Sequence, residues 1–196
     1  MISYEDIRRH MLPGDVIAFG GKGNFSNIIK WRTRSQVSHV GTILQTGITG
    51  DIRFFNQLIE ATSLNGFNGV SISRVSDRLR GYKGNVWWLP LSDEAREKFD
   101  EVAFFDFMFQ QVGKLYDTAQ AIKSAIDWLP WCHNKEDFQK LFCSELLAGG
   151  DKAGGLINLN CSEVTPVDAC RWKLYKDCYQ LRGEPTEIRR FNSVTV

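Results

Sequence analysis

Two β-rich stretches decide the fold of this chain: VSHVGTILQT at residues 37–46 and IRFFNQLIEAT at residues 52–62. Both are rich in β-branched and aromatic residues, which favour strands. The intervening GITGD at residues 47–51 supplies turn-forming residues. Together the three segments predict a β-hairpin whose first strand carries His39 and whose second strand carries Glu60.

The predicted hairpin brings His39 and Glu60 together. A turn centred between Thr49 and Gly50 puts the two residues directly opposite each other, with Cβ atoms about 4.5–5.5 Å apart on one face. Glu60 can then accept a hydrogen bond from the imidazole, which fixes the ring tautomer and favours the charged form. The pairing depends on register, because a slip of one residue separates the pair and lets Asn56 compete as the polar partner.

Cys143 is the candidate nucleophile that this histidine would serve. A thiol attacks strongly only as thiolate, and a nearby imidazole is the usual means of forming one at neutral pH. The chain has three histidines, so the choice of base is narrow. We expect His10 at the surface of a polar N-terminal helix. His133 follows Cys132 directly in the sequence, and two adjacent residues have poor geometry for a catalytic pair. His39 is therefore the candidate base.

The sequence leaves the place of Cys143 within its helix open. If Cys143 lies in the first turn, the helix dipole favours the thiolate, and backbone N–H groups can bind an oxyanion. Glu145 suits such a first turn. Phe142 is a poor N-cap, however, and the pattern also allows one continuous helix from Lys135.

Composition limits the classes of protein that need consideration. The chain has 196 residues, enough for one substantial core, and we expect a single α+β domain over residues 1–196. Its net charge of +1 disfavours nucleic acid as a partner. Five cysteines without a CxxC pair argue against both a disulfide framework and a zinc site. We therefore expect no metal and no organic cofactor.

The rest of the chain alternates predicted strands and helices. Ser92 and the Thr165-Pro166 pair have the residue types of helix starts, and the Gly149-Gly150 pair that of a helix end. We expect strands at residues 15–19, 69–73 and 85–91, and an edge strand at residues 187–191. We expect helices at residues 4–11, 26–33, 92–111 and 118–128, and one or two helices within residues 134–149.

Five short motifs occur in a specific order along residues 12–175. They are Gly14-Asp15-Val16-Ile17, Ser38-His39-Val40-Gly41, Ile59-Glu60-Ala61, Tyr116-Asp117 and Phe142-Cys143-Ser144-Glu145. This order resembles the circularly permuted NlpC-type, papain-like cysteine hydrolases, the YiiX-like group. In ordinary papain-like enzymes the cysteine precedes the histidine, whereas here the order is histidine, acid, cysteine, as in the permuted branch.

The resemblance implies a fold and a chemistry. The fold would be an antiparallel half-barrel sheet packed against helices, with the cysteine presented at the start of a helix. The chemistry would be hydrolysis of an amide or ester acyl group, or acyl transfer. By position, Cys143 would be the nucleophile, His39 the general base and then acid, and Glu60 the residue that orients His39.

Three further residues are expected to contact substrate. Tyr116 matches a family tyrosine near the site, and Ser38 belongs to the histidine motif. Trp131, with Trp128 on the other side of a proline, fits a substrate wall or lipid-contacting loop as well as it fits a core plug.

These observations predict an amidase or peptidase acting on peptides, with cell-wall fragments suggested by family analogy alone. A lipid or ester acyl hydrolase or acyltransferase and a non-catalytic binding module remain alternatives. The N-terminal residues lack the apolar core of a signal peptide, and the most apolar window, residues 102–109, is too short to span a bilayer. We therefore expect a cytoplasmic protein as encoded, unless a specialised secretion system exports it. The oligomeric state stays open.

Overall fold

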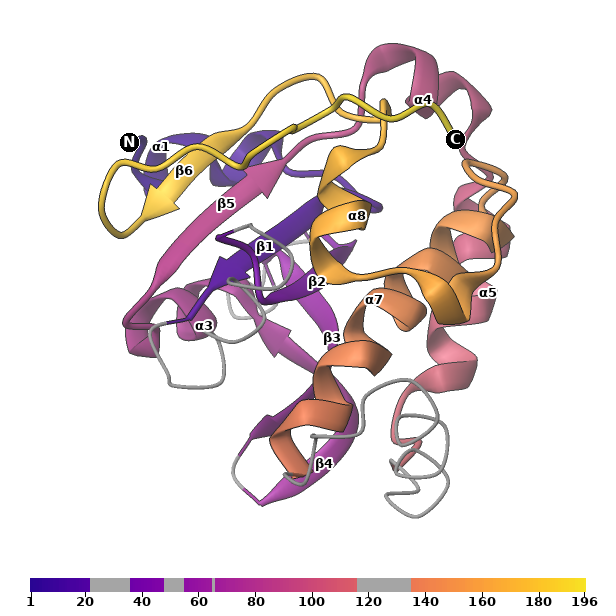
Figure 1. Ribbon diagram of the computed structural model, residues 1–196, viewed down its shortest axis with the longest axis horizontal. Helices are drawn as coiled ribbons and strands as arrows, with labels where there is room; N and C mark the ends of the chain where they lie inside the picture. Colours follow the sequence, from indigo (N-terminus) through magenta and orange to yellow (C-terminus); the bar gives the residue numbers. More distant parts are fainter. Residues whose placement is uncertain (22–35, 48–54, 65, 116–134) are drawn as a thin grey trace.

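The structure is a computed structural model that describes residues 1–21, 36–47, 55–64, 66–115 and 135–196. It contains a six-stranded antiparallel sheet with the strand order β4-β3-β2-β1-β5-β6. The expected α+β class, with an antiparallel sheet packed against helices, is confirmed, and the sheet is open (Figure 1). The strands are β1 (Val16–Gly20), β2 (His39–Gln45), β3 (Gln57–Leu64), β4 (Phe67–Arg74), β5 (Asn85–Leu89) and β6 (Tyr179–Arg182).

Helices cover both faces of the sheet. On one face α7 (Lys135–Ala153) lies against β2 and β3, with α5 (Glu101–Gln111) and α8 (Pro166–Arg171) beside it. On the other face, residues of α1 (Tyr4–Ile7) and α3 (Val75–Gly81) join a second apolar cluster. The other short helices of the described residues are η1 (Arg8–His10), α4 (Asp93–Lys98) and η3 (Cys161–Glu163). None of the helices in the described ranges is long and apolar enough to cross a membrane.

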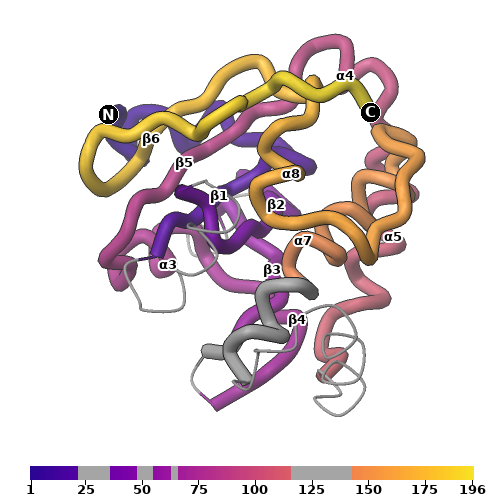
Figure 2. The backbone as a smooth tube through the Cα atoms, viewed as in Figure 1, coloured from indigo at the N-terminus to yellow at the C-terminus, as the bar shows by residue number. Residues whose placement is uncertain are grey.

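Strand β1 shows how the sheet divides the core into two layers. Val16 and Ala18 pack into the cluster that contains α7, whereas Ile17 and Phe19 pack into the cluster that contains α1 and α3. All four side chains are buried, which explains why this strand is an unbroken apolar run rather than an alternating one. The N-terminal segment closes the far edge beside β6, where the Ile2 amide donates to the Gln180 carbonyl at 3.0 Å (Figure 2).

The predicted hairpin forms between β2 and β3, but its register differs by two residues from the expected one. Thr42 pairs with Ile59, and continuing this register puts Gly41 opposite Glu60. Among the described residues β2 ends at Gln45 and β3 begins at Gln57, and most of the predicted turn at residues 47–51 lies outside the described residues. A shift of two residues keeps the same side chains on the same face.

The helix expected over residues 92–111 is two helices. Ser92 caps α4 as predicted, accepting from the Ala95 amide at 3.2 Å. Asp100 then caps α5 by accepting from the Ala103 amide at 3.0 Å. A second capping side chain inside the periodic run therefore ends one helix and starts the next. The aromatic residues of α5 are only partly core: Phe104 is fully buried, whereas Phe109 is 49% exposed.

Gly149 and Gly150 do not end a helix, contrary to the prediction. Helix α7 continues through them to Ala153. A Cβ at Gly149 would lie 2.4 Å from the Phe107 ring, and one at Gly150 would lie 2.1 Å from the Met108 Cε. The two glycines therefore allow α5 and α7 to approach closely, and tertiary packing outweighs their low helix propensity.

Other local predictions have mixed outcomes. The Thr165-Pro166 start of α8 is confirmed, with a capping box completed by Asp168. The strand expected at residues 187–191 is wrong, because residues 187 and 188 are irregular and residues 189–192 form a turn in which Arg190 has a φ of 58°. Strand β6 was not predicted. The helices expected at residues 26–33 and 118–128 lie outside the described residues.

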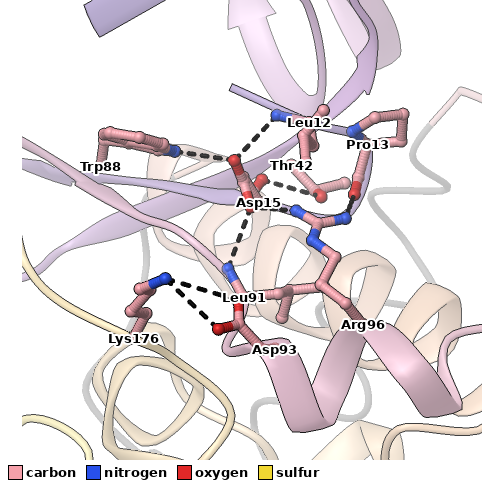
Figure 3. Close-up of polar contacts among 9 residues, drawn as sticks. All are labelled: Leu12, Pro13, Asp15, Thr42, Trp88, Leu91, Asp93, Arg96 and Lys176. Carbon is pink, nitrogen blue, oxygen red and sulfur yellow. Dashed lines mark hydrogen bonds and ion pairs between the residues drawn. The ribbon is translucent and has the colours of Figure 1, made fainter. Parts of the chain in front are cut away.

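The buried carboxylate of Asp15 ties β1 to β5 and α4 (Figure 3). It accepts hydrogen bonds from the Trp88 indole at 2.9 Å and from the Leu12 and Leu91 amides at 2.9 and 3.0 Å. The Arg96 guanidinium pairs with the same carboxylate. The bond to the Leu12 amide closes a turn, and the same carboxylate also holds the Trp88 indole, the Leu91 amide and the Arg96 guanidinium.

We predict that Asp15→Ala lowers the free energy of unfolding by about 3–5 kcal/mol, because the buried donors and the Arg96 charge lose their acceptor. Urea denaturation measures this change. The matched control is Asp93→Ala, which removes an exposed ion pair to Lys176 and should alter stability little. Equal effects of the two substitutions would contradict the role given to Asp15.

Besides Asp15, the carboxyl group of Asp151 on helix α7 is also buried. Neither of its oxygens has a hydrogen-bond partner among the described residues. Burial raises the pKa of Asp151 from its ordinary 3.8 to about 8. The folded protein therefore holds a proton that the unfolded chain releases, and stability falls as pH rises between these two values.

We predict that Asp151→Asn removes this dependence. The stability of the variant relative to wild type should increase by about 1.4 kcal/mol for each pH unit between about pH 5 and pH 8. Urea denaturation across that range measures the divergence. Asp106→Asn, at an exposed position of α5, is the control and should run parallel to wild type. Parallel curves for Asp151→Asn as well would show that Asp151 is not held protonated.

Candidate active site

His39 and Glu60 form a hydrogen-bonded pair at the junction of β2 and β3. The His39 Nε2 atom lies 2.7 Å from the Glu60 Oε2 atom. The Glu60 side chain is fully buried and the His39 side chain is 12% exposed. The contact that the hairpin predicted is therefore present, although it runs diagonally between the strands rather than directly across them.

Gly41 makes this diagonal contact possible. A Cβ at Gly41 would lie 3.1 Å from the Glu60 Cβ and 3.0 Å from the Leu58 Cδ1. Without that atom, the Glu60 side chain has room to pass over β2 toward His39, two residues earlier on the same face.

Arg78 and Ser73 hold the other side of the Glu60 carboxylate. The Arg78 Nη2 atom donates to Glu60 Oε2 at 2.9 Å, and the Arg78 Nε atom lies 2.5 Å from Oε1. The Ser73 hydroxyl donates to Oε1 at 3.3 Å. Oε1 thus has partners on β4 and α3, and Oε2 has partners on β2 and α3. Neither Arg78 nor Ser73 was identified from the sequence.

Cys143 meets His39 from helix α7. The Cys143 side chain forms a hydrogen bond with the imidazole, and since Nε2 faces Glu60, Nδ1 is the ring nitrogen left for the sulfur. Cys143 is 1% exposed. The neighbouring Ser144 hydroxyl donates to the Val164 carbonyl at 2.5 Å, which connects α7 to the residue before the cap of α8.

These contacts set the charge of the two ionisable partners. Burial lowers the pKa of His39, but the interactions with Cys143 and Glu60 outweigh it and raise the pKa to about 9. Burial likewise raises the pKa of Glu60, and the charges and hydrogen bonds of His39 and Arg78 reverse that effect and lower it. At neutral pH the pair is therefore an imidazolium beside a carboxylate.

Cys143 does not begin its helix. Helix α7 starts at Lys135, more than two turns earlier, so the backbone amide of Cys143 belongs to the helix interior. Of the two alternatives left by the sequence, the continuous helix is the one observed. Activation by the helix N-terminus and an oxyanion site on its first amides are thereby excluded for Cys143, and His39 is the group in position to stabilise a thiolate.

Ser38 lies beside the candidate site with its hydroxyl turned inward. The side chain is buried, and the hydroxyl donates to the Phe19 carbonyl at 3.3 Å and accepts from the Gly21 amide at 3.1 Å. It also shares a hydrogen bond with Tyr82. These contacts fix the ends of β1 and β2 around His39, and whether Ser38 contacts substrate remains a prediction.

The other predicted residues have different outcomes. Tyr116, Trp131 and His133 lie outside the described residues. Asn56 is not a partner of His39: its side-chain amide donates to the Arg8 carbonyl at 2.7 Å and secures the N-terminal helix. His10 is exposed, as expected.

Four of the described side chains lie in a row in which each contacts the next. It runs from Cys143 through His39 and Glu60 to Arg78. Such a row can form a thiolate, orient an imidazole and transfer a proton to a leaving group. Within the described ranges, no group of three His, Cys, Asp or Glu side chains is arranged to hold a metal ion.

We predict that Glu60→Gln lowers the pKa of His39 from about 9, because the carboxylate charge that favours the imidazolium is removed. Titration of the His39 ring by NMR measures the change. Because the pKa of His39 is higher in the folded protein than in the unfolded chain, its protonation also stabilises the wild-type fold. This contribution is fully present below about pH 6.5 and disappears as pH rises through about pH 9. Glu97→Gln, exposed on α4, is the control. An unchanged His39 titration in Glu60→Gln would contradict the assignment.

The sequence matches no protein-family model, and a search of curated proteins finds no match to it. The resemblance to permuted papain-like hydrolases therefore depends on the five motifs alone, and any function must be argued from the geometry of the site.

Proposed function

We propose that this protein is a cysteine hydrolase that cleaves an amide bond, as an amidase or peptidase of the permuted NlpC-type, papain-like half-barrel fold. One observation carries the proposal: the His39 ring is bonded on one side to the Cys143 thiol and on the other to the buried Glu60 carboxylate. This is the relation of nucleophile, base and orienting group that defines a catalytic triad, independent of their order in the chain.

The reaction begins with the proton of Cys143 on His39. The thiolate attacks the carbonyl carbon of the substrate, forming a carbon–sulfur bond and a tetrahedral oxyanion. As the intermediate collapses, the carbon–nitrogen bond breaks and the His39 imidazolium gives its proton to the departing amine. The neutral His39 then takes a proton from water, whose oxygen attacks the thioester carbon. The carbon–sulfur bond breaks, the acid is released, and Cys143 leaves as the thiolate beside the His39 imidazolium that began the cycle.

The high pKa of His39 suits the first half of this sequence. With a pKa of about 9, the imidazolium already carries at neutral pH the proton that the leaving amine needs. Glu60 keeps Nε2 protonated throughout, so that Nδ1 exchanges the proton with sulfur and substrate. The carboxylate remains charged because its pKa is lowered.

The burial of Cys143 sets a condition on substrate access. With the residue 1% exposed, a substrate carbonyl reaches the sulfur only after the atoms covering it are displaced. In the proposed mechanism, displacement of these atoms therefore precedes the chemistry.

The substrate class is proposed from the resemblance. Peptide amides, foremost those of cell-wall fragments, are the first candidates, and no cofactor is needed for the chemistry. Thiol-directed acyl probes of increasing chain length test this choice. Preference for short peptide-like probes supports an amidase, and preference for long-chain esters would instead indicate a lipid acyl hydrolase or acyltransferase.

We predict that iodoacetamide labels Cys143 selectively and that labelling persists below neutral pH, because the adjacent imidazolium stabilises the thiolate. Peptide mapping after brief treatment across a pH series measures this. Burial raises the pKa of Cys161, Cys170 and Cys178, so these thiols provide an internal comparison within the same sample.

His39→Ala is the matched variant and should reduce labelling of Cys143 at about pH 6 by at least about tenfold. Slow, uniform labelling of all the cysteines in the wild-type protein would overturn the proposal. A normal phenotype for Cys143→Ala in the cell of origin would instead favour a binding module without turnover.

A further inference from the structure

Arg78 is the charged group of this cluster that the proposed chemistry leaves without a role. It comes from α3, on the face of the sheet opposite α7, and its side chain is 15% exposed. Its guanidinium contacts both oxygens of Glu60, at 2.9 and 2.5 Å. The carbon at the centre of the guanidinium also lies 5.2 Å from the centre of the Phe19 ring.

The same phenylalanine contacts the histidine. The centres of the Phe19 and His39 rings are 5.5 Å apart, so Phe19 is a shared neighbour of the imidazole and the guanidinium. Tyr82 packs edge-on against Phe19 at 5.1 Å. Arg78 is thus fixed in two ways, by a forked contact with the carboxylate and by a cation–π contact with the ring.

Charge balance shows what this arrangement does. A buried carboxylate without a fixed cation would take up a proton or leave its position. With Arg78 present, a thiolate, an imidazolium, a carboxylate and a guanidinium sum to zero. Without Arg78, the same protonation states carry a net negative charge in a buried site, and the cluster would retain one more proton.

We propose that Arg78 is a positioning residue for the Cys143–His39 pair: it fixes Glu60 against His39 and supplies the positive charge that keeps the thiolate form of the cluster neutral. This inference rests on the proposed function. Arg78 does not touch the reacting atoms, and it acts through Glu60. Among the described residues, the ionisable groups that interact with this carboxylate are His39 on β2, Arg78 on α3 and Tyr82 after α3.

The first test is the pH profile of Cys143 alkylation in Arg78→Met, Arg78→Gln and Arg78→Lys. Loss of a positive charge raises the pKa of every neighbouring acid, so the profile of the neutral variants should move upward by about one pH unit. Arg78→Lys keeps the charge and should restore the midpoint, with a lower labelling rate because lysine lacks the forked geometry. Arg80→Met, on the same helix but 78% exposed, should match wild type.

The second test does not require an activated thiol. In a Cys143→Ala background, ¹⁵N chemical shifts of the neutral His39 ring report its tautomer. We expect a hydrogen on Nε2 with Arg78 or Arg78→Lys, and a mixture of tautomers in Arg78→Gln, where Glu60 is less firmly held.

The two tests separate the possible failures. If the wild-type Cys143 thiol is not activated, the proposed function is wrong, and the His39 tautomer still shows whether Arg78 positions Glu60. A normal wild-type profile that does not move in Arg78→Gln or Arg78→Met, together with an unchanged tautomer, overturns the role of Arg78 alone. Reduced stability without either change would show that Arg78 is only a structural ion pair. If Arg78→Met does not fold, Arg78→Gln and Arg78→Lys provide the comparison.

Discussion

The buried carboxylate of Glu60 is the constraint on which the candidate site depends. A carboxylate removed from water is unfavourable unless several donors and an opposite charge surround it. Here the donors come from β2, β4 and α3, so one group links three elements that are distant in the chain. Because His39 is one of these donors, satisfying the buried charge also fixes the orientation of the imidazole.

The fold supplies this environment from both sides of the sheet. Helix α3 contributes Arg78 from one face of the sheet. Helix α7 packs on the other face and contributes Cys143, which contacts His39 at the start of β2. Gly149 and Gly150 of α7 allow α5 to pack closely against that helix, which contributes to the position of α7. The geometry of the candidate site therefore depends on packing as well as on the side chains of Cys143, His39 and Glu60.

The sequence was sufficient for the strands β1 to β5 and for the shared face of His39 and Glu60, but it did not predict β6. The shared face was predicted correctly despite an error of two residues in the register, because side chains alternate between the two faces of a strand with a period of two. Pattern alone could not show that Asp100 starts a new helix or that Gly150 serves close packing, since both depend on tertiary neighbours. Arg78 was missed because nothing local indicates that α3 folds back over Glu60; the available signal was that a buried glutamate needs a cation.

A crystal structure of the reduced protein at neutral pH tests the central claim most directly. We predict that the Cys143 sulfur lies within hydrogen-bonding distance of His39 Nδ1, with Glu60 between His39 Nε2 and the Arg78 guanidinium. A sulfur directed into the apolar core, or a His39 ring turned away from both partners, would contradict it.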